Sequence, residues 1–274
     1  MTLGIAWVRQ QGETRELVVA FDSRLSGGQA WDGCPKLLLF PRSDCILGFA
    51  GDTLDAYPLM LQIQNAINMY PKTRDRTLDV VHLKGHMTRI FHHMRKYIHT
   101  LPRGQTEPSP LDVDFIFGGY SWREKDFRFW KLRASGQSFV PEPAEHWGKE
   151  TDRWRIKFVG DEAPVRSAKK NLASLLRDRN KLPAGDFDME PFEVLRDIIR
   201  SGEFPSVGGP PQLVKVYEHM NTLPFALFWP TKASNKVTAL GRPLMDYELS
   251  SWPVLDPDDI RFRPDDEAIH TQLR

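Results

Sequence analysis

Two histidines have a spacing that can bind a metal ion. His82 and His86 are four residues apart, so a helix would place both imidazoles on one face. No glutamate follows the first histidine as it does in the HExxH zinc motif, and the sequence shows no clear third ligand. We interpret the pair as part of a polar or inter-subunit helix face, and we predict no metal and no other cofactor.

Three Gly-Gly pairs, at 27–28, 118–119 and 208–209, raise the question of phosphate binding. None has the GxxxxGK[ST] form or opens a helix after a strand, so none predicts a P-loop. The formal net charge is +1, from 37 Lys and Arg against 36 Asp and Glu. A general nucleic-acid binder would usually carry a basic excess. The sequence therefore predicts no nucleic-acid partner.

The elements that must position any site begin with short β-favouring runs. Residues 2–9 and 16–22 predict a hairpin, and a glycine-rich loop over 23–33 follows it. Helical spacing then predicts two helices, and Thr77 is expected to cap the second. Pro58 falls in the first helix, where a proline is tolerated only in the first turn. Further strands are predicted over 36–40 and 45–50, and the two helices over 52–70 and 78–98.

The second half repeats this order of strands, two helices and strands. Because like elements are grouped and do not alternate, the sequence favours an α+β fold over a parallel doubly wound sheet. We predict two stacked, mostly antiparallel sheets with a helix pair on each outer face, over residues 2–241, and a C-terminal extension over 242–274. The predicted elements are strands over 113–120, 127–132, 138–142 and 153–160, helices over 163–180 and 190–200, and strands over 212–218, 223–229 and 236–240.

The N-terminal residues and the cysteines bear on the compartment. The first residues lack the basic start, apolar run and cleavage site of a signal peptide, and no run is long enough to span a bilayer. Two cysteines, Cys34 and Cys45, do not make a disulfide framework, so we expect reduced thiols. These features predict a cytoplasmic protein with no membrane partner.

Four segments in order resemble the opening of proteasome β subunits and of the related bacterial ATP-dependent ring protease, within a superfamily that includes Anbu-like proteins. The segments are TLGIAW, LVVAFDSRLSGG, PKLLLF and ILGFAGDTLDA, within residues 2–56. More loosely, FIFGGY, the Gly160-Asp161 turn and SVGGPPQLVKVY extend the resemblance to about residue 241. The resemblance implies a four-layer αββα N-terminal nucleophile (Ntn) hydrolase.

The resemblance makes Thr2 the candidate nucleophile, exposed once Met1 is removed. A threonine hydroxyl is a weak nucleophile unless a base takes its proton, and the α-amine of a first residue can do so. That amine titrates near roughly 7.7–8.0, so a useful fraction is neutral at physiological pH. Without the resemblance, Thr2 would be an ordinary strand threonine.

Lys36 and Asp22 match a lysine and an aspartate that the family pairs beside the threonine. The lysine would lower the amine pKa and stabilise charge on the hydroxyl oxygen. Gly51 matches the glycine whose N–H binds the oxyanion. Without the resemblance, Lys36 would be a solvated lysine at the end of a strand, and Asp22 would be an aspartate that favours a turn.

The second half departs from the family pattern. Many active β subunits carry an Asp and a Ser before the late Gly-Gly, whereas Val207 stands at the serine position and Ser206 is one residue away. The serine expected after Gly160 is Asp161. We keep Asp161 and Ser206 as possible supporting residues.

The sequence therefore predicts a threonine-type amidohydrolase, most simply a peptidase acting on peptides or proteins. The alternative is an inactive proteasome-like subunit that serves as an assembly or binding module, and the departures at Ser206 and Val207 favour it. We also expect a homo-oligomer above a dimer, a ring or spiral, and an ATPase partner is possible. The second predicted helix, with His86 and Ile90 among mixed polar and apolar residues, suits a subunit contact.

Overall fold

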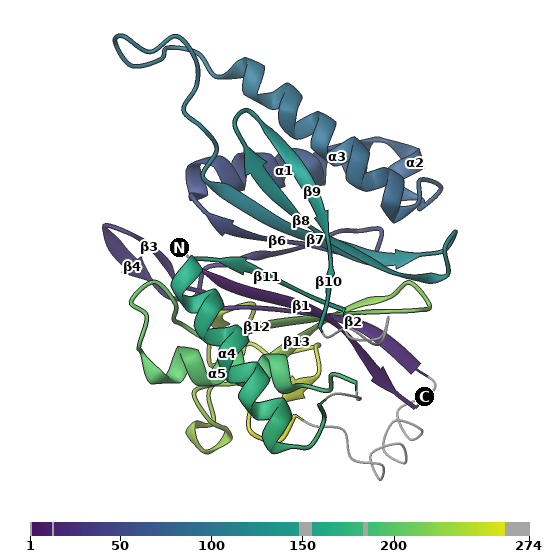
Figure 1. The fold of residues 1–274 in the computed structure, drawn as a ribbon, viewed down its shortest axis with the longest axis vertical. Coiled ribbons are helices and arrows are strands. Elements are labelled where there is room, and N and C mark those ends of the chain that lie inside the picture. Colours follow the sequence, from purple (N-terminus) through teal and green to yellow (C-terminus); the bar gives the residue numbers. More distant parts are fainter. Residues whose placement is uncertain (1, 13, 148–154, 183–185, 261–274) are drawn as a thin grey trace.

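The strands of this chain pair mostly antiparallel, and helices are grouped between them (Figure 1). The computed structural model describes residues 2–12, 14–147, 155–182 and 186–260. The strands are β1 (Leu3–Gln11), β2 (Thr14–Phe21), β3 (Leu25–Gly27), β4 (Gln29–Trp31), β5 (Leu37–Leu39), β6 (Cys45–Gly51), β7 (Val113–Ser121), β8 (Asp126–Ser135), β9 (Ser138–Pro143), β10 (Glu145–His146), β11 (Arg155–Gly160), β12 (Gln212–Tyr217), β13 (Thr222–Phe228), β14 (Val237–Ala239), β15 (Arg242–Pro243) and β16 (Val254–Leu255).

The helices fall into two groups along the chain. The helices are α1 (Thr53–Met69), α2 (Pro71–Arg74), α3 (Val80–Met94), α4 (Glu162–Asp178) and α5 (Glu190–Ser201), with 3-10 turns η1 (Arg95–Tyr97) and η2 (Lys232–Ser234). Both groups lie where grouped helical periodicity predicts them. The chain is thus an α+β protein, as the sequence predicts.

Two large sheets account for most strands of the described residues. One has the order β10-β11-β1-β2-β12-β13-β14-β15, with β16 beside β13, and the other has the order β5-β6-β7-β8-β9. Pairing is antiparallel except between β13 and β16. β3 and β4 form a separate hairpin.

Strand β1 shows how sequence alternation sets the packing. Leu3, Ile5 and Trp7 are buried in a cluster with α4 and α5. Ala6 and Val8 point the other way, into a cluster between the two sheets. Because successive strand side chains face opposite sides, a strand covered on both faces has a continuous apolar run.

The five-stranded sheet is covered by the other helices. Phe49 of β6 and Phe115 and Phe117 of β7 pack in one cluster with buried residues of α1 and α3. Figure 1 shows α1 and α3 over this sheet, and α4 and α5 beside the larger one at the other end of the molecule.

The ring of Phe21 lies between the two sheets at the end of β2. A Cβ added at Gly4 of β1 would lie 2.3 Å from the ring, and one at Gly48 of β6 would lie 2.7 Å from it. The ring therefore occupies space that only two glycines leave open. This packing fixes the end of the strand that Asp22 follows.

The predicted loop over 23–33 contains the hairpin of β3 and β4, so the loop prediction is wrong there. Gly27 pairs with Gln29, and Gly28 between them has a φ of 109°. A glycine adopts positive φ readily, which permits a tight hairpin turn. The glycine pair that suggested a loop instead makes this turn.

The helix details differ from the prediction at three points. Asp79, not Thr77, caps α3, because its carboxylate accepts a hydrogen bond from Val81 N at 2.9 Å. The α-helix ends at Met94, before the predicted 98, and continues only as η1. Pro58 lies beyond the first turn of α1. The carbonyl that loses a partner there belongs to Leu54, which is 82% exposed, so water can replace the bond.

The C-terminal extension joins its own sheet as far as it is described. β15 pairs with β14 and β16 pairs with β13, while Ile260 packs in the cluster beside α5. Residues 261–274 of the predicted extension lie outside the described residues. Among the described helices, none combines the length and apolarity needed to cross a membrane.

Candidate functional site

Three residues from separate strand ends meet in the interior. Thr2 precedes β1, Asp22 follows β2 and Lys36 precedes β5. Lys36 Nζ donates to Thr2 Oγ1 at 2.5 Å and to Asp22 Oδ1 at 2.8 Å. Lys36 and Asp22 are 0% exposed and Thr2 is 1% exposed. The fold therefore brings the three predicted residues into one hydrogen-bonded group.

Backbone amides hold the Asp22 carboxylate in place. Its Oδ1 accepts from Leu3 N at 3.1 Å, and its Oδ2 accepts from Gly208 N at 3.1 Å and from Arg24 N at 3.2 Å. Charge-assisted hydrogen bonds of this kind are strong. They orient one carboxylate oxygen toward Lys36.

Gln212 is a residue of this group that the sequence interpretation missed. Its Oε1 accepts from Lys36 N at 3.0 Å and from Leu37 N at 3.3 Å. Its Nε2 donates to Cys34 O at 2.8 Å and to Asp22 O at 3.3 Å. All four hydrogen-bonding positions of the buried amide are used. Gln212 thus fixes the backbone on both sides of the ion pair.

Burial dominates the electrostatics of the pair. Burial lowers the pKa of Lys36 below its usual value, and the attraction of Asp22 acts against that shift. Burial likewise raises the pKa of Asp22, against Lys36 and the N–H groups of Leu3 and Gly208. The carboxylate and the ammonium thus compensate each other where both side chains are buried.

Two cavities lie beside this group and share Gly51 and Asp161 in their walls. The larger, of about 940 Å³, is also lined by the exposed side chains of Trp31 and Leu54, and the smaller is about 250 Å³. Asp161 N donates to Thr2 O at 3.1 Å, which connects both cavities to the start of β1. Gly51 ends β6 with a φ of 124°, and an added Cβ would lie 2.2 Å from Asp112 O. Gly51 is therefore at a position where only glycine fits.

The structure also joins the two possible supporting residues. Ser206 Oγ donates to Asp161 Oδ2 at 2.8 Å. Val207, at the position where the family carries serine, is buried in the cluster beneath α5. Gly160 lies opposite Leu3, and an added Cβ there would come within 1.9 Å of Thr2 O. Asp161 and Ser206 thus lie next to the start of β1, while Val207 faces the core.

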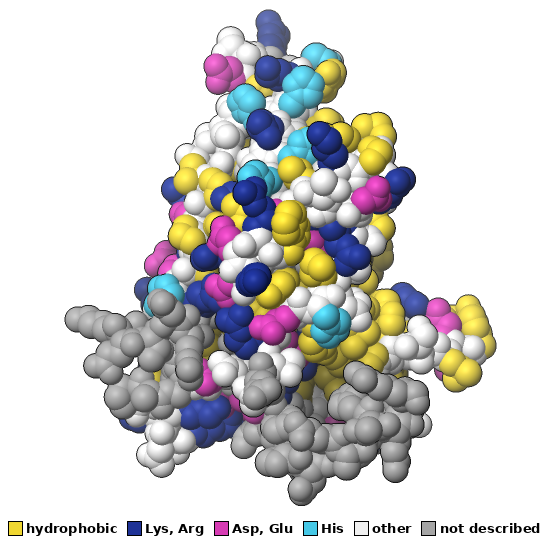
Figure 2. Space-filling view, turned by 90° about the vertical axis from the view of Figure 1, so that its right-hand side faces the viewer, with side chains coloured by type: hydrophobic (Ala, Val, Ile, Leu, Met, Phe, Trp, Pro, Cys, Tyr) yellow, Lys and Arg dark blue, Asp and Glu magenta, His cyan; other side chains and the backbone are white. Residues whose placement is uncertain are grey.

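The two histidines of the dismissed zinc motif have different neighbours. His82 Nε2 lies 3.3 Å from Arg123 Nη1, and the His86 ring lies 5.9 Å from the ring of Tyr70. Figure 2 shows histidine and basic side chains interspersed in the upper part of one face, at the end of the molecule where Figure 1 has α3. The described residues contain no group of three or more His, Cys, Asp or Glu arranged to hold a metal ion. Cys34 and Cys45 are buried thiols that form no disulfide.

The arrangement has the parts of a nucleophilic hydrolytic site. A hydroxyl lies against a buried ammonium, and Asp161, in the wall of the larger cavity, donates to the backbone carbonyl of Thr2. Searches of protein-family models and of the curated proteins found no match for this chain.

Proposed function

We propose that this chain is an N-terminal-threonine amidohydrolase of the proteasome β-subunit type, acting as a peptidase after removal of Met1. The observation that carries the proposal is the contact of Lys36 Nζ with both Thr2 Oγ1, at 2.5 Å, and Asp22 Oδ1, at 2.8 Å. Burying the ammonium of Lys36 costs free energy, and the paired carboxylate of Asp22 offsets that cost beside the Thr2 hydroxyl.

The proposed reaction uses the chain's own groups and needs no cofactor. The neutral α-amine of Thr2 takes the Oγ1 proton, directly or through water, and Oγ1 attacks the carbonyl carbon of the peptide. Lys36 stabilises negative charge on Oγ1, and the N–H of Gly51 donates to the tetrahedral oxygen. The C–N bond then breaks as the amine delivers the proton to the leaving nitrogen, and water hydrolyses the ester that remains.

The packing of the sheets supports the corresponding fold assignment. α1 and α3 pack on one sheet, α4 and α5 pack on the other, and a third apolar cluster lies between the sheets. We assign this arrangement to the four-layer αββα Ntn-hydrolase fold. Asp161, at the start of α4, and Ser206, between α5 and β12, would support the threonine in place of the family's usual Asp and Ser.

The larger cavity supports a peptide as substrate. Trp31 is 69% exposed and Leu54 82% exposed at its wall, and exposed apolar side chains at a cavity favour binding of side chains from a partner. Gly51 lies on the same wall. An extended peptide could therefore place its carbonyl at Gly51 and its neighbouring side chains against Trp31.

Mass determination of the purified chain tests the proposal first. We expect a chain that begins at Thr2 and that a threonine-directed epoxyketone labels at that residue. Thr2→Ser should keep labelling, and Thr2→Ala should abolish it. A chain that fully retains Met1 would refute the mechanism, because the amine would no longer adjoin Oγ1.

A second function rests on a different observation. In the chain that begins with Met1, Thr2 is 1% exposed and neither adjacent cavity is lined by it. That burial favours a non-catalytic subunit, which keeps the fold as an assembly or binding module. An unchanged cellular phenotype in a Thr2→Ala strain would support this function over the peptidase.

We further propose a cytoplasmic homo-oligomer above a dimer, with an ATPase as a possible partner. A cavity of about 600 Å³ between α1 and α3 is lined mostly by apolar surface, and Met69 at its edge is 79% exposed. Such exposed apolar surface is typical of subunit contacts. A single monomeric mass in light scattering at micromolar concentration would count against assembly.

A further inference from the structure

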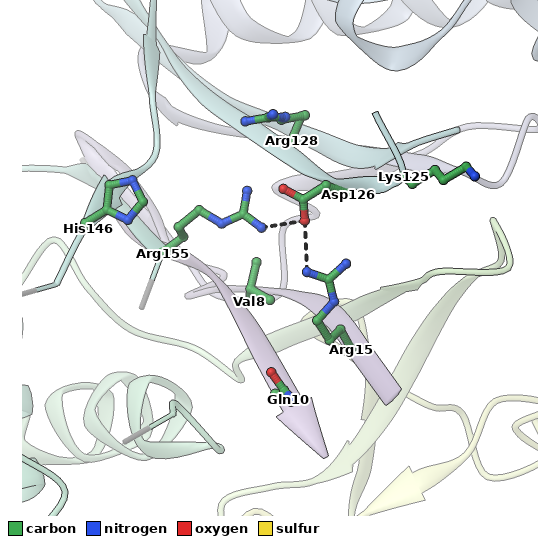
Figure 3. A pocket seen from close by; sticks show the side chains of 8 residues that line it. All are labelled: Val8, Gln10, Arg15, Lys125, Asp126, Arg128, His146 and Arg155. Atoms are coloured by element: carbon green, nitrogen blue, oxygen red, sulfur yellow. Dashed lines mark hydrogen bonds and ion pairs between the residues drawn. The ribbon is translucent and has the colours of Figure 1, made fainter. Parts of the chain in front are cut away.

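A further pocket, lined by polar and charged residues, lies toward the opposite end of β1 from Thr2. Its volume is about 520 Å³, within the usual range for small-molecule sites. Val8 of β1 lines it, and six residues of extended strand from Thr2 span roughly 20 Å. The pocket is therefore separate from the candidate active site. Its lining is Val8, Gln10, Arg15, Lys125, Asp126, Arg128, His146 and Arg155 (Figure 3).

Cationic side chains dominate this lining. The lining includes four cations, from Arg15, Lys125, Arg128 and Arg155, and one carboxylate, that of Asp126. Figure 3 shows Arg15 and Arg155 pointing toward Asp126 from two sides and Arg128 extending across above them, while Lys125 points away toward the rim. Three strands, β2, β8 and β11, thus contribute one guanidinium group each to the pocket.

The single carboxylate is already matched by two of these cations. Asp126 Oδ1 accepts from Arg15 Nη1 at 3.0 Å and from Arg155 Nη2 at 2.8 Å. Burial alone would raise the pKa of Asp126, but these two guanidinium groups hold it below its usual range. Asp126 therefore remains ionised and acts as a fixed brace between the arginines.

Donor capacity in the pocket remains unused. Arg155 Nε is buried and has no hydrogen-bond partner in the described structure. Arg15 donates through Nε to Glu218 and through Nη1 to Asp126, so Nη2 adds a further donor. Buried donors are normally satisfied, which points to a missing acceptor. Among the described residues, the pocket has four cations against three carboxylates even with Glu218 and Glu124 counted.

We infer that this pocket binds the di- or triphosphate group of a small molecule. Guanidinium groups bind phosphate oxygens through paired N–H donors. A cluster of arginines therefore favours a phosphate ligand over a carboxylate ligand, which carries less charge. Arg128 and Arg15 would hold successive phosphates, Arg155 Nε would donate to an inner oxygen, and Lys125 would screen the mouth. The phosphates come either from a free polyphosphate or from a nucleotide.

Calorimetric titration with pyrophosphate and with ADP tests the inference on the full chain. We expect saturable binding of both probes to the wild type, together with a rise in Tm, because a ligand that binds only the folded state stabilises it. Equal affinity would assign recognition to the phosphates alone, whereas tighter ADP binding would show that the nucleoside also contributes. Binding should weaken as salt is added, since ions screen the attraction.

Two variants with opposite expected signs locate the site. Arg128→Gln should weaken pyrophosphate binding by about tenfold or more, as loss of a charged hydrogen bond predicts. Asp126→Asn should tighten it, because the negative charge that lines the pocket itself is gone. Arg128 is 44% exposed in its side chain and pairs with Glu124 on the surface, so Arg128→Gln is expected to fold.

Arg166→Gln is the matched control. Arg166 also pairs with a glutamate four residues earlier, Glu162, but on the exposed face of α4. Its binding of pyrophosphate should equal that of the wild type. The inference is overturned if the wild type binds neither probe at millimolar concentration, or if Arg128→Gln and Asp126→Asn both bind as the wild type does. Activity at Thr2 does not enter these readouts, so the peptidase proposal stands or fails separately.

Discussion

Two buried lysine–carboxylate pairs in this molecule are alike in distance and unlike in surroundings. Lys36 Nζ lies 2.8 Å from Asp22 Oδ1, and Lys215 Nζ lies 2.8 Å from Glu16 Oε1. Burial lowers the pKa of both lysines, against the attraction of their carboxylates. Neither the ion pair nor the direction of the shift therefore distinguishes a reactive site from a structural one.

The third contact differs between the two pairs. At Lys215 the network continues into further charges: Glu16 also accepts from Arg9 Nη1 at 2.7 Å, and Arg9 Nε donates to Asp188 at 2.6 Å. At Lys36 the third contact is the uncharged hydroxyl of Thr2. A buried charge directed at a hydroxyl favours chemistry, whereas one directed at other charges favours stability.

Replacing each lysine gives the largest contrast. Lys36→Met should reduce epoxyketone labelling and peptide hydrolysis by at least about a thousandfold, because charge on Oγ1 loses its partner. Lys215→Met should leave labelling unchanged while destabilising the fold by about 3 kcal/mol, the effect of breaking a buried pair. Labelling rates and urea denaturation measure the two effects. Equal loss of labelling in both variants would remove the distinction between the pairs.

Removing the carboxylate of the structural pair should affect stability alone. Glu16→Gln leaves Arg9 and Lys215 buried together without their shared anion, and we expect a loss of about 3 kcal/mol at neutral pH. Urea denaturation at neutral pH measures it. A loss below about 1 kcal/mol would show that the network behaves like an exposed ion pair.

The pH dependence of that loss follows from the direction of the Glu16 shift. Burial alone would raise the pKa of Glu16, but Lys215 and Arg9 hold it below its ordinary value of 4.5. Its contribution is therefore fully present above about 4.5, the unfolded value, and is lost as pH falls through the folded value. The stability gap between wild type and Glu16→Gln should narrow only in acid. A gap that stays constant down to pH 3 would contradict the assigned shift.

Gln212 is expected to have the smallest effect, because it contacts the Lys36–Asp22 pair only through the backbone. Gln212→Leu leaves the N–H groups of Lys36 and Leu37 without an acceptor, and a small displacement of Lys36 should slow labelling by about tenfold. Gln62→Leu, at an exposed position of α1, is the control and should not change the rate. Unchanged labelling in Gln212→Leu would show that the amide supports only the fold.

The strands, the helices and part of the candidate site could be predicted from the sequence for a physical reason. Strands covered on both faces need continuous apolar runs, so β1, β2, β6 and β7 are visible directly. Thr2, Asp22 and Lys36 each stand at the edge of such a run within the first 36 residues. Thr2 and Asp22 become neighbours because β1 and β2 pair, whereas β5 belongs to the other sheet, so the place of Lys36 beside them is predicted from the family resemblance alone. Whether they react stays a prediction.

The features that the sequence did not predict depend on a choice between two similar residues or on contacts between residues far apart in the chain. Thr77 and Asp79 both suit a helix cap. Of the two, Asp79 also accepts a hydrogen bond from Ser121 Oγ, at 3.0 Å. Gln212 lies 176 residues from Lys36, so no local pattern connects them. One signal was present: Gln212 shares a strand face with Val214 and Val216, which pack between the sheets. A glutamine on that face requires buried partners.

The ring of Phe21 has a consequence for how related sequences can differ. It occupies the space above Gly4 and Gly48, which belong to strands in different sheets, and Asp22 follows it directly. A side chain gained at either glycine would need a smaller residue at 21, and that exchange would move the carboxylate that holds Lys36. Among homologous chains, positions 4, 21 and 48 are therefore expected to covary, and chains that keep the lysine–aspartate pair should keep all three.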